Sequence, residues 1–340
     1  MTTALETRKP VLDALNAEMA RQLGDSRDSI INNAKLANTI AATINSNKRL
    51  IMLGMGGSHA VGRALEPCYR ALGIDAVAIP LSEQLDAPLP LAGRSVIVTS
   101  QSGESAEVLR WFDEDHAPKD CFGLTMEPKS SLAKLAPSLI GAGGSELPFA
   151  ATRSLTVTLA LHASVLRALG ADLGATMEML DTVTSSDVVP AVAKFATVRA
   201  IVTSGRAQQG VAEAIALGLT ELSRLPCFSL EGGQLRHGPV EMLGPDVGVV
   251  MFRDADPSST YVTNLAEFVI ATSESPLIVF DASGLPPITG AQTILCPAAT
   301  GLTASFSLLP PAQRFMVDFA ASRVADVGTP LRCSKVTKVE

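Results

Sequence analysis

The sequence predicts an α/β protein built from two tandem doubly wound parallel sheets, preceded by an N-terminal helical segment. Three observations predict this class. The chain has 340 residues, enough for about two domains at ~150 residues each. It is 47% hydrophobic but only 4% aromatic, as expected for buried parallel strands rich in Ala, Val, Ile and Leu. Short apolar runs alternate with helical patterns, and the series of runs occurs twice.

The first elements are predicted to be helical. Leu12, Leu15, Met19 and Leu23 recur at helical spacing, and the residues from Ile30 to Ile44 do so again. The glycine and polar residues at 24–26 predict a break between the two helices. We therefore expect an N-terminal helical segment over residues 1–35.

A first sheet domain is predicted over residues 36–182, because apolar runs alternate there with helical stretches. The expected helices include 60–72 and 106–113. The expected strands lie at 49–54, 77–79, 95–99, 122–125 and 139–140.

A second sheet domain is predicted over residues 183–325, because four of these runs return in the same order. The run at 199–204 repeats the run at 49–54 at an offset of 150 residues, and later runs repeat at offsets of 152 to 155. The linker is expected near 182–189, where Thr, Ser and Asp cluster before Pro190. Residues 326–340 form a tail that is expected to close the active site.

Composition excludes several classes of function. The net charge is −7 with a pI near 5.2, the wrong sign for a nucleic-acid-binding protein. No apolar run is long enough to span a membrane and no signal peptide is visible, so a cytoplasmic protein is expected. The five cysteines form no C-x-x-C motif, which indicates reduced thiols. Neither a metal nor a cofactor is expected.

A glycine-rich loop over residues 54–58 follows the first predicted strand. Its glycines permit tight turns and close backbone approach to a ligand, and Ser58 is predicted to cap the next helix. The spacing is not G-x-G-x-x-G, so a dinucleotide site is a weak interpretation. A plain tight turn with a capping serine fits this loop equally well.

A second loop carries the sharper signal. Residues 100–105 read Ser-Gln-Ser-Gly-Glu-Ser and stand between a predicted strand and a predicted helix. Hydroxyls, an amide and free backbone N–H groups at a helix start suit a phosphate dianion. The loop has no P-loop lysine. A serine-rich helix cap is an equally good interpretation of these residues alone.

Two residues of the second domain are acid–base candidates. His237 stands in a glycine-flanked loop, and histidine is the residue type most often used as an acid–base group at neutral pH. Glu221 has apolar neighbours on a predicted helix, and burial would raise its pKa as a general base requires. A surface carboxylate is the simpler interpretation of Glu221. Solvated or core positions account for His116 and His162.

Three motifs together resemble the tandem sugar isomerase (SIS) domain family, whose domains are flavodoxin-like. They are the loop at 100–105, Gln-Leu-Arg-His-Gly-Pro at 234–239, and the terminal segment 334–340. The resemblance covers about residues 36–340, and this part of the chain is similar to the isomerase domain of glucosamine-6-phosphate synthase.

The resemblance implies a role for each site residue. Glu221 would move a proton between C1 and C2, and His237 would open the sugar ring from the neighbouring subunit, which implies a homodimer. Lys335 would form a Schiff base with a ketose. The residues implied to bind the substrate are Gly57, Ser58, Ser100, Gln101, Ser102, Ser105, Phe149 and Ser334.

The chain also departs from the family pattern. Gly218 stands in place of an active-site lysine, Gly57 in place of a threonine and Ala151 in place of a serine. The chain begins Met-Thr-Thr with no glutaminase domain, so glutamine hydrolysis is not expected. The expected function is an amino-sugar phosphate isomerase or deaminase of the glucosamine-6-phosphate or fructose-6-phosphate type. A deglycase of 6-phosphorylated fructose–amine conjugates and a non-catalytic sugar-phosphate sensor are the alternatives.

Overall fold

The computed structural model describes residues 2–114, 116–182 and 186–337, and its chain divides into two compact units. The first-sheet unit comprises Leu15–Asp181 and Pro330–Glu340. The second-sheet unit comprises Met1–Ala14 and Thr182–Thr329. The expected domain boundary at 182/183 and the last three residues of the expected tail fall on positions outside the described residues.

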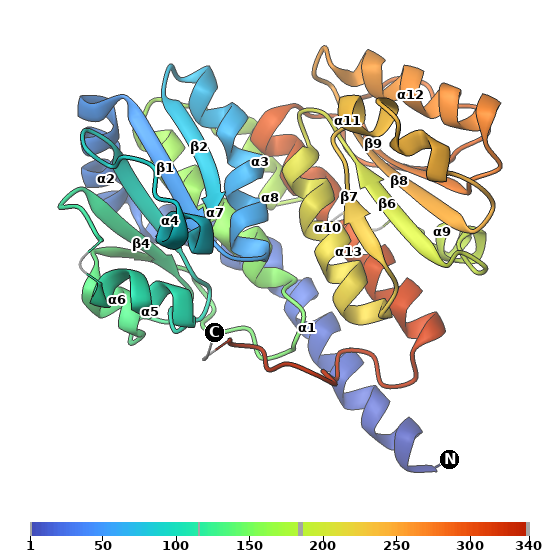
Figure 1. The fold of residues 1–340 in the computed structure, drawn as a ribbon, viewed down its shortest axis with the longest axis horizontal. Helices are drawn as coiled ribbons and strands as arrows, with labels where there is room; N and C mark the ends of the chain where they lie inside the picture. The colour runs from blue at the N-terminus through green and yellow to red at the C-terminus, as the bar shows by residue number, and fades with distance from the viewer. Residues whose placement is uncertain (1, 115, 183–185, 338–340) are drawn as a thin grey trace. The chain divides into compact units, whose positions relative to one another are not determined.

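The first sheet has five parallel strands in the order β2-β1-β3-β4-β5 (Figure 1). Strand β1 pairs with both β2 and β3, so its residues Leu50 to Gly54 are buried between neighbours. The strands are β1 (Arg49–Gly54), β2 (Asp75–Pro80), β3 (Ser95–Thr99), β4 (Cys121–Thr125) and β5 (Ser138–Ile140).

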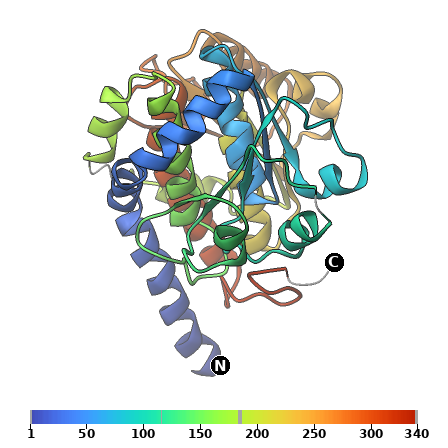
Figure 2. The same ribbon diagram turned by 90° about the vertical axis from the view of Figure 1, so that its left-hand side faces the viewer.

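Helices cover both faces of this sheet. One face carries α2 (Ala34–Asn47), α3 (Gly57–Ala71) and α7 (Arg153–Ala168), drawn in blue and green in Figure 2. The other face carries α4 (Leu81–Asp86), α5 (Ala106–Asp113) and α6 (Ser131–Leu135), which bury Trp111 and Leu132 against the strands. Helix α8 (Gly174–Leu180) ends the unit's main segment. Apolar strands enclosed by two helix layers explain the high aliphatic content.

The second sheet repeats this topology in the order β10-β9-β8-β6-β7. Matching strands by position gives the order 2-1-3-4-5 in both sheets, which confirms two doubly wound domains. The strands are β6 (Ala200–Ser204), β7 (Cys227–Ser229), β8 (Val247–Asp254), β9 (Leu277–Ala282) and β10 (Gln292–Leu295). The helices are α9 (Val189–Lys194), α10 (Gln209–Ser223), α11 (Gly232–Arg236), α12 (Ser259–Thr272), α13 (Gly301–Arg323) and a 3₁₀ turn at Pro239–Met242.

The expected break at residues 24–26 was wrong. Helix α1 runs without interruption from Thr2 to Asn32 and passes through Gly24. The buried Arg153 side chain holds Glu18 and Asp25, which lie on either side of that glycine. The break comes at Asn33 instead. Its side-chain Nδ2 donates to the Ile140 carbonyl, and its Oδ1 accepts from the Ile140 amide. Tertiary contacts therefore outweigh the local glycine signal.

None of the helices in the described ranges is both long enough and apolar enough to cross a membrane.

Candidate functional site

Two candidate loops follow neighbouring strands of the first sheet. Loop 54–58 continues β1 and loop 100–105 continues β3, and Gly54 pairs with Thr99 in the parallel register. The two strands therefore end at the same level. In the order 2-1-3-4-5, β2 lies on one side of β1 and the later strands lie on the other side, so the direction in which strands are added reverses between β1 and β3. Open α/β sheets bind ligands at such a switch point. The topology thus brings together the two loops that the sequence singled out.

Loop 100–105 is held in shape by its own serines. Ser100 is 6% exposed, and its Oγ accepts a hydrogen bond from the Gly103 amide at 3.1 Å. Ser102 Oγ accepts from the Glu104 amide at 3.2 Å. Gly103 has a φ of +65°, and a β-carbon there would meet Ser130 Oγ at 2.3 Å, so only glycine fits this turn. The loop is therefore a defined turn in which the Gly103 and Glu104 amides bond to its own serine hydroxyls.

Two polar groups of this loop bond neither its own backbone amides nor those of the following helix. Ser105 is the N-cap residue of α5, but its side chain makes no capping bond and lies 3.4 Å from Ser100 Oγ. Gln101 places its Oε1 at 2.8 Å from Ser154 Oγ, while its buried Nε2 finds no partner among the described residues. The Ser105 hydroxyl is therefore bonded to Ser100 and not to the helix amides, and the Gln101 Nε2 donor has no partner among the described residues.

The glycine loop differs from expectation in one respect. Helix α3 begins at Gly57 with Gly56 as its N-cap, so Ser58 lies inside the first turn and does not cap it. The capping prediction was wrong because Gly56, at a φ of +51°, already makes the turn into the helix. At Gly57 a β-carbon would meet Leu155 Cδ2 at 2.8 Å, so Leu155 occupies the space that a larger residue would need.

A buried carboxylate orders the segment that precedes α7. Glu146 is 4% exposed and accepts hydrogen bonds from the backbone amides of Thr152, Arg153 and Ser154. It thus neutralises the N-terminus of α7, where negative charge is favourable. Ser154 also contacts Gln101, so this carboxylate supports the phosphate-loop candidate indirectly.

The C-terminal tail packs against the first-sheet unit. Lys335 Nζ donates to the Pro148 carbonyl, and the Ala106 amide at the start of α5 donates to the Thr337 carbonyl at 3.0 Å. Ser334 is exposed and bonds the Val336 carbonyl at 2.7 Å. Half-buried Phe149 follows the proline that binds the lysine. The tail therefore places Lys335 in the unit that holds both loops.

Glu221 and His237 belong to the second-sheet unit. Glu221 is half-buried in the last turn of α10, and His237 is exposed directly after α11. Three residues before Glu221, a β-carbon at Gly218 would meet Met316 Sδ of α13 at 2.2 Å. The space at Gly218 is therefore filled by methionine and not open to a ligand.

The remaining titratable groups have structural surroundings. His162 is fully buried with Nδ1 at 3.0 Å from the Tyr69 hydroxyl, and burial lowers its pKa to about 3. His116 is exposed beside Glu114. Burial raises the pKa of the Cys121 thiol to about 12. Within the described ranges, no group of three or more His, Cys, Asp or Glu residues could hold a metal ion.

Sequence reasoning missed the supporting residues of the site. The Thr125 hydroxyl donates to the Gln101 carbonyl at 3.2 Å. Ser154, which is held by Glu146, donates to the Gln101 side chain. Thr125 ends β4, next to β3 in the sheet, so its place at the end of a neighbouring strand was the available signal. Glu146 binds the backbone amides six to eight residues further along the chain, and no side-chain motif in the sequence marks such a contact.

Comparison with curated proteins finds relatives that are longer than this chain. A glutamine–fructose-6-phosphate aminotransferase (isomerizing) from Lactiplantibacillus plantarum is 24% identical over 343 aligned positions. The alignment covers 94% of this chain and 55% of that protein, so the chain spans about half the length of the curated relatives it matches. No protein-family model matches the chain.

Solved structures share the fold. Tagatose-6-phosphate ketose/aldose isomerase from Escherichia coli aligns with a TM-score of 0.80 at 20% identity, covering 94% of this chain and 95% of that one. Glucosamine-6-phosphate deaminase from Thermotoga maritima aligns with a TM-score of 0.72 at 19% identity, covering 95% and 99%. Together with the sequence relatives, they confirm the predicted resemblance to tandem sugar isomerase proteins.

Proposed function

We propose that this protein is an enzyme that acts on a phosphorylated amino sugar, of the glucosamine-6-phosphate or fructose-6-phosphate type. It would move a proton between C1 and C2, as an isomerase or deaminase. One observation carries the proposal: loop 100–105 stands at the switch point of the first sheet with a serine hydroxyl that does not cap the following helix and an amide donor that has no partner among the described residues. The comparisons support the substrate class, because the similar proteins are named for hexose 6-phosphates.

The phosphate would bind at the start of α5. Ser105 and Gln101 would donate to its oxygens, and Ser100 and Ser102 would shape the turn around it. The Ala106 amide already donates to the Thr337 carbonyl of the tail, so the phosphate would use the other donors of this helix start. Charge-assisted hydrogen bonds of this kind contribute roughly 1.5–3 kcal/mol each. Gly57 and Ser58 would border the same pocket from the neighbouring loop.

The chemical step would use three side chains. His237 would transfer a proton to open the sugar ring, and Glu221 would then carry a proton between C1 and C2. The Lys335 amine would condense with a C2 ketone, releasing water and forming an imine that acidifies the adjacent C–H bond. In the structure the Pro148 carbonyl binds this lysine, which keeps Nζ beside the segment containing Phe149.

A panel of substrates tests the function. The purified protein is incubated with hexose 6-phosphates, amino-sugar 6-phosphates and 6-phosphorylated fructose–amine conjugates, and ammonia, amine, aldose and ketose are measured. We expect turnover of an amino-sugar phosphate. Glu221→Gln should reduce it by about 10²–10⁴-fold, the usual contribution of a general base. Glu213→Gln, on the same helix and also half-buried, is the matched control and should retain activity.

Two other outcomes would replace this function. Release of amine from conjugates alone would indicate the deglycase. The glycine at 218 provides no added space for such a conjugate, because Met316 occupies the position of its missing side chain. Binding of a sugar phosphate without turnover of any compound would indicate the sensor.

We further propose a homodimer in which His237 serves the partner's site. A mixture of inactive Glu221→Gln and inactive His237→Ala proteins should regain part of the activity after subunit exchange. Absence of recovery in verified mixed dimers would show that both residues act within one chain.

A further inference from the structure

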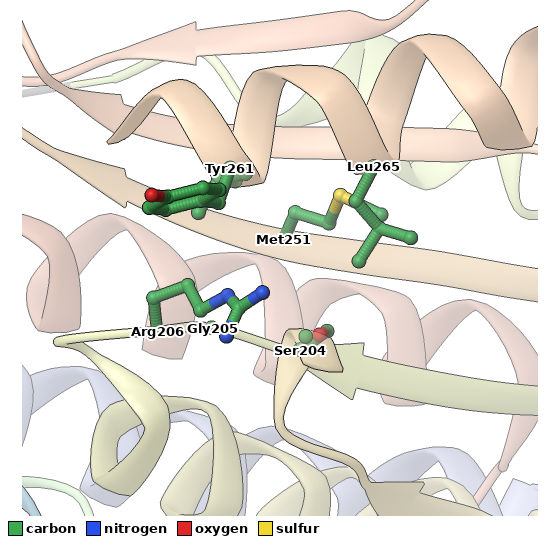
Figure 3. A pocket seen from close by; sticks show the side chains of 8 residues that line it. Ser204, Gly205, Arg206, Met251, Tyr261 and Leu265 are labelled. Atoms are coloured by element: carbon green, nitrogen blue, oxygen red, sulfur yellow. The ribbon is translucent and has the colours of Figure 1, made fainter. Parts of the chain in front are cut away.

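The switch point of the second-sheet unit is closed by packing. The hollow between its strand ends is too small to hold a water molecule, so the polar groups buried there, Ser204 Oγ and Arg206 Nε, are not open to a ligand. Arg206 is held in place by an ion pair with Glu231 at 2.8 Å. The residues that Figure 3 labels around the hollow are Ser204, Gly205, Arg206, Met251, Tyr261 and Leu265. A buried carboxylate of the first-sheet unit, in contrast, contacts two parts of the proposed active site.

This carboxylate, Glu146, closes a loop. It is 4% exposed and accepts hydrogen bonds from the backbone amides of residues 152–154 and from the Thr152 hydroxyl at 2.6 Å. The loop starts at the surface, where Leu147 is exposed, and then turns inward to the buried Pro148. One side chain therefore ties the two ends of this loop together.

The loop holds the lysine of the tail. Lys335 Nζ donates to the Pro148 carbonyl, two residues after Glu146. The tail has a second contact at the start of α5, where the Ala106 amide donates to the Thr337 carbonyl at 3.0 Å. The Pro148 carbonyl can keep Nζ in place only while the loop keeps its shape, and the contacts of Glu146 set that shape.

The same carboxylate contacts the phosphate-loop candidate through one hydroxyl. Ser154 is 1% exposed, and its Oγ lies within hydrogen-bonding distance of Glu146 Oε2 and of Gln101 Oε1, the latter at 2.8 Å. A hydroxyl has one proton and donates to one acceptor at a time. Glu146 has three backbone amides and the Thr152 hydroxyl as further donors. The Ser154 proton can therefore go to Gln101 without leaving the carboxylate unpaired.

We propose that Glu146 is a positioning residue for two groups of the proposed active site. It would hold Lys335 through the Pro148 carbonyl, and it would hold the Gln101 side chain through Ser154. The inference rests on the proposed function, because it assigns Glu146 to that same site. Glu146 would not touch the substrate. It would keep the amine that attacks the ketone and the loop that binds the phosphate in fixed positions, and fixed reacting groups lower the entropic part of the barrier.

Three variants separate the two branches of this network. Glu146→Gln keeps the shape of the side chain but replaces one acceptor oxygen by an amide donor, which cannot accept from backbone amides. Ser154→Ala removes only the branch to Gln101. Glu66→Gln is the matched control: Glu66 lies in α3, is 2% exposed and accepts from the Ala78 amide at 2.6 Å, and it takes no part in either branch.

Two measurements on the ligand-free protein test the hold on the lysine. Glu146→Gln should speed hydrogen exchange of the amides of residues 152–154, because they lose their acceptor. Acetic anhydride should then acetylate Lys335 about threefold or more faster than in the unmodified protein, measured by mass spectrometry relative to the exposed Lys129. Ser154→Ala and Glu66→Gln should leave the Lys335 rate unchanged.

Fructose 6-phosphate tests the effect on the site. Borohydride reduces an imine on Lys335 to a secondary amine, and the trapping rate at saturating fructose 6-phosphate reports how well the amine is placed. Ser154→Ala should weaken calorimetric binding of this compound roughly three- to tenfold but keep the saturated trapping rate within about twofold. Glu146→Gln should lose as much affinity and also trap about tenfold or more slowly. Glu66→Gln should match the unmodified protein in both.

The outcomes separate this inference from the function on which it rests. If the unmodified protein neither binds fructose 6-phosphate nor labels Lys335, the proposed function fails and the assignment of Glu146 fails with it. If the unmodified protein does both, and Glu146→Gln either matches Glu66→Gln or changes only one of affinity and trapping, this inference alone is overturned. Circular dichroism checks folding. Thr152→Val, which removes one hydroxyl donor to Glu146, replaces Glu146→Gln if that variant does not fold and should cause the same changes.

Discussion

Two serines at helix starts of the first-sheet unit use their hydroxyls differently. Ser130 is the N-cap residue of α6, and its Oγ accepts from the Ala133 amide at 3.3 Å. Ser105 has the same position at α5 but makes no such bond. A capping bond contributes about 1 kcal/mol to stability. The Ser105 hydroxyl contributes no such bond, and this supports a role in ligand binding.

We expect Ser105→Ala to leave the free energy of unfolding nearly unchanged. It should weaken binding of a sugar phosphate by roughly 1.5–3 kcal/mol, because a donor to the dianion is lost. Isothermal titration with phosphorylated and unphosphorylated sugar measures the effect, and only the phosphorylated ligand should lose affinity. Ser130→Ala is the matched control and should lose about 1 kcal/mol of stability. Equal losses for both ligands would show that Ser105 is structural.

Lys335 offers a second test at the residue scale. Polar residues near a chain terminus are usually frayed, but this tail has hydrogen bonds to Pro148 and Ala106. If Lys335 forms an imine, borohydride added with a ketose phosphate should leave a stable adduct on that residue, identified by mass spectrometry of peptides. Lys335→Arg should abolish the adduct and retain the charge. Turnover without labelling would remove Lys335 from the mechanism.

At the scale of elements, the contact between α10 and α13 explains a departure from the family pattern. The β-carbon that any other residue would bring at Gly218 falls 2.2 Å from Met316 Sδ. The helices therefore approach closely at this point, and the loss of a lysine at 218 is coupled to packing. A lysine could not be restored there without moving Met316.

We expect Gly218→Ala to destabilise the protein by about 1 kcal/mol in urea unfolding. Overpacking costs about 1–3 kcal/mol and exceeds the gain of roughly 1 kcal/mol from alanine over glycine in a helix. Gly24→Ala in α1 is the control: no atom lies within 4 Å of its β-carbon, so only the gain should be seen. In a Met316→Ala background Gly218→Ala should no longer destabilise. Persistence of the loss there would exclude Met316 as its cause.

Helix α1 shows why local signals fail at this scale. Gly24 is a weak helix former, yet its neighbours Glu18 and Asp25 are bound by one buried arginine from α7. Together, several charge-assisted hydrogen bonds stabilise the helix by more than the roughly 1 kcal/mol by which glycine is a weaker helix former than alanine. The glycine signal was real and the tertiary contact outweighed it.

For the whole molecule, the buried His162 links stability to pH. Burial lowers its pKa from 6.5 to about 3, because the charged form cannot be hydrated between α3 and α7. Above pH 6.5 the imidazole is neutral in both the folded and unfolded chain. Between pH 6.5 and 3 only the unfolded chain binds the proton, so stability falls as the pH falls. Below pH 3 both states are protonated and the loss is complete.

We expect the free energy of unfolding to decrease by up to roughly 5 kcal/mol from this group over that range. Urea unfolding at pH 7, 6, 5 and 4 measures the slope. His162→Gln should be less stable at pH 7 but show a flatter pH dependence. His116→Gln, at an exposed position, should retain the slope of the unmodified protein. Identical slopes in both variants would place the pH dependence elsewhere.

The two sheets also show how much of the architecture sequence can predict. Four strand pairs were matched from apolar runs, and the shared order 2-1-3-4-5 confirms the repeat. The pair β2 and β7 was not matched, because β7 has only three residues and an exposed Phe228 at an edge of its sheet. Edge strands carry a weaker apolar signal than strands buried on both faces.

The sequence alone determined the fold class, the repeat and the position of loop 100–105, since these depend on apolar periodicity and on residues adjacent in the chain. Only the tertiary structure decided how the hydroxyls of that loop are used, why residue 218 is glycine, and that Ser204 and Arg206 line a hollow with unpaired groups. The physical reasons differ. The loop's hydroxyls bond groups two to five residues away, and the folded backbone decides which of these local partners each one takes. The neighbours of the Gly218 β-carbon come from a segment distant in sequence, and no local pattern specifies them.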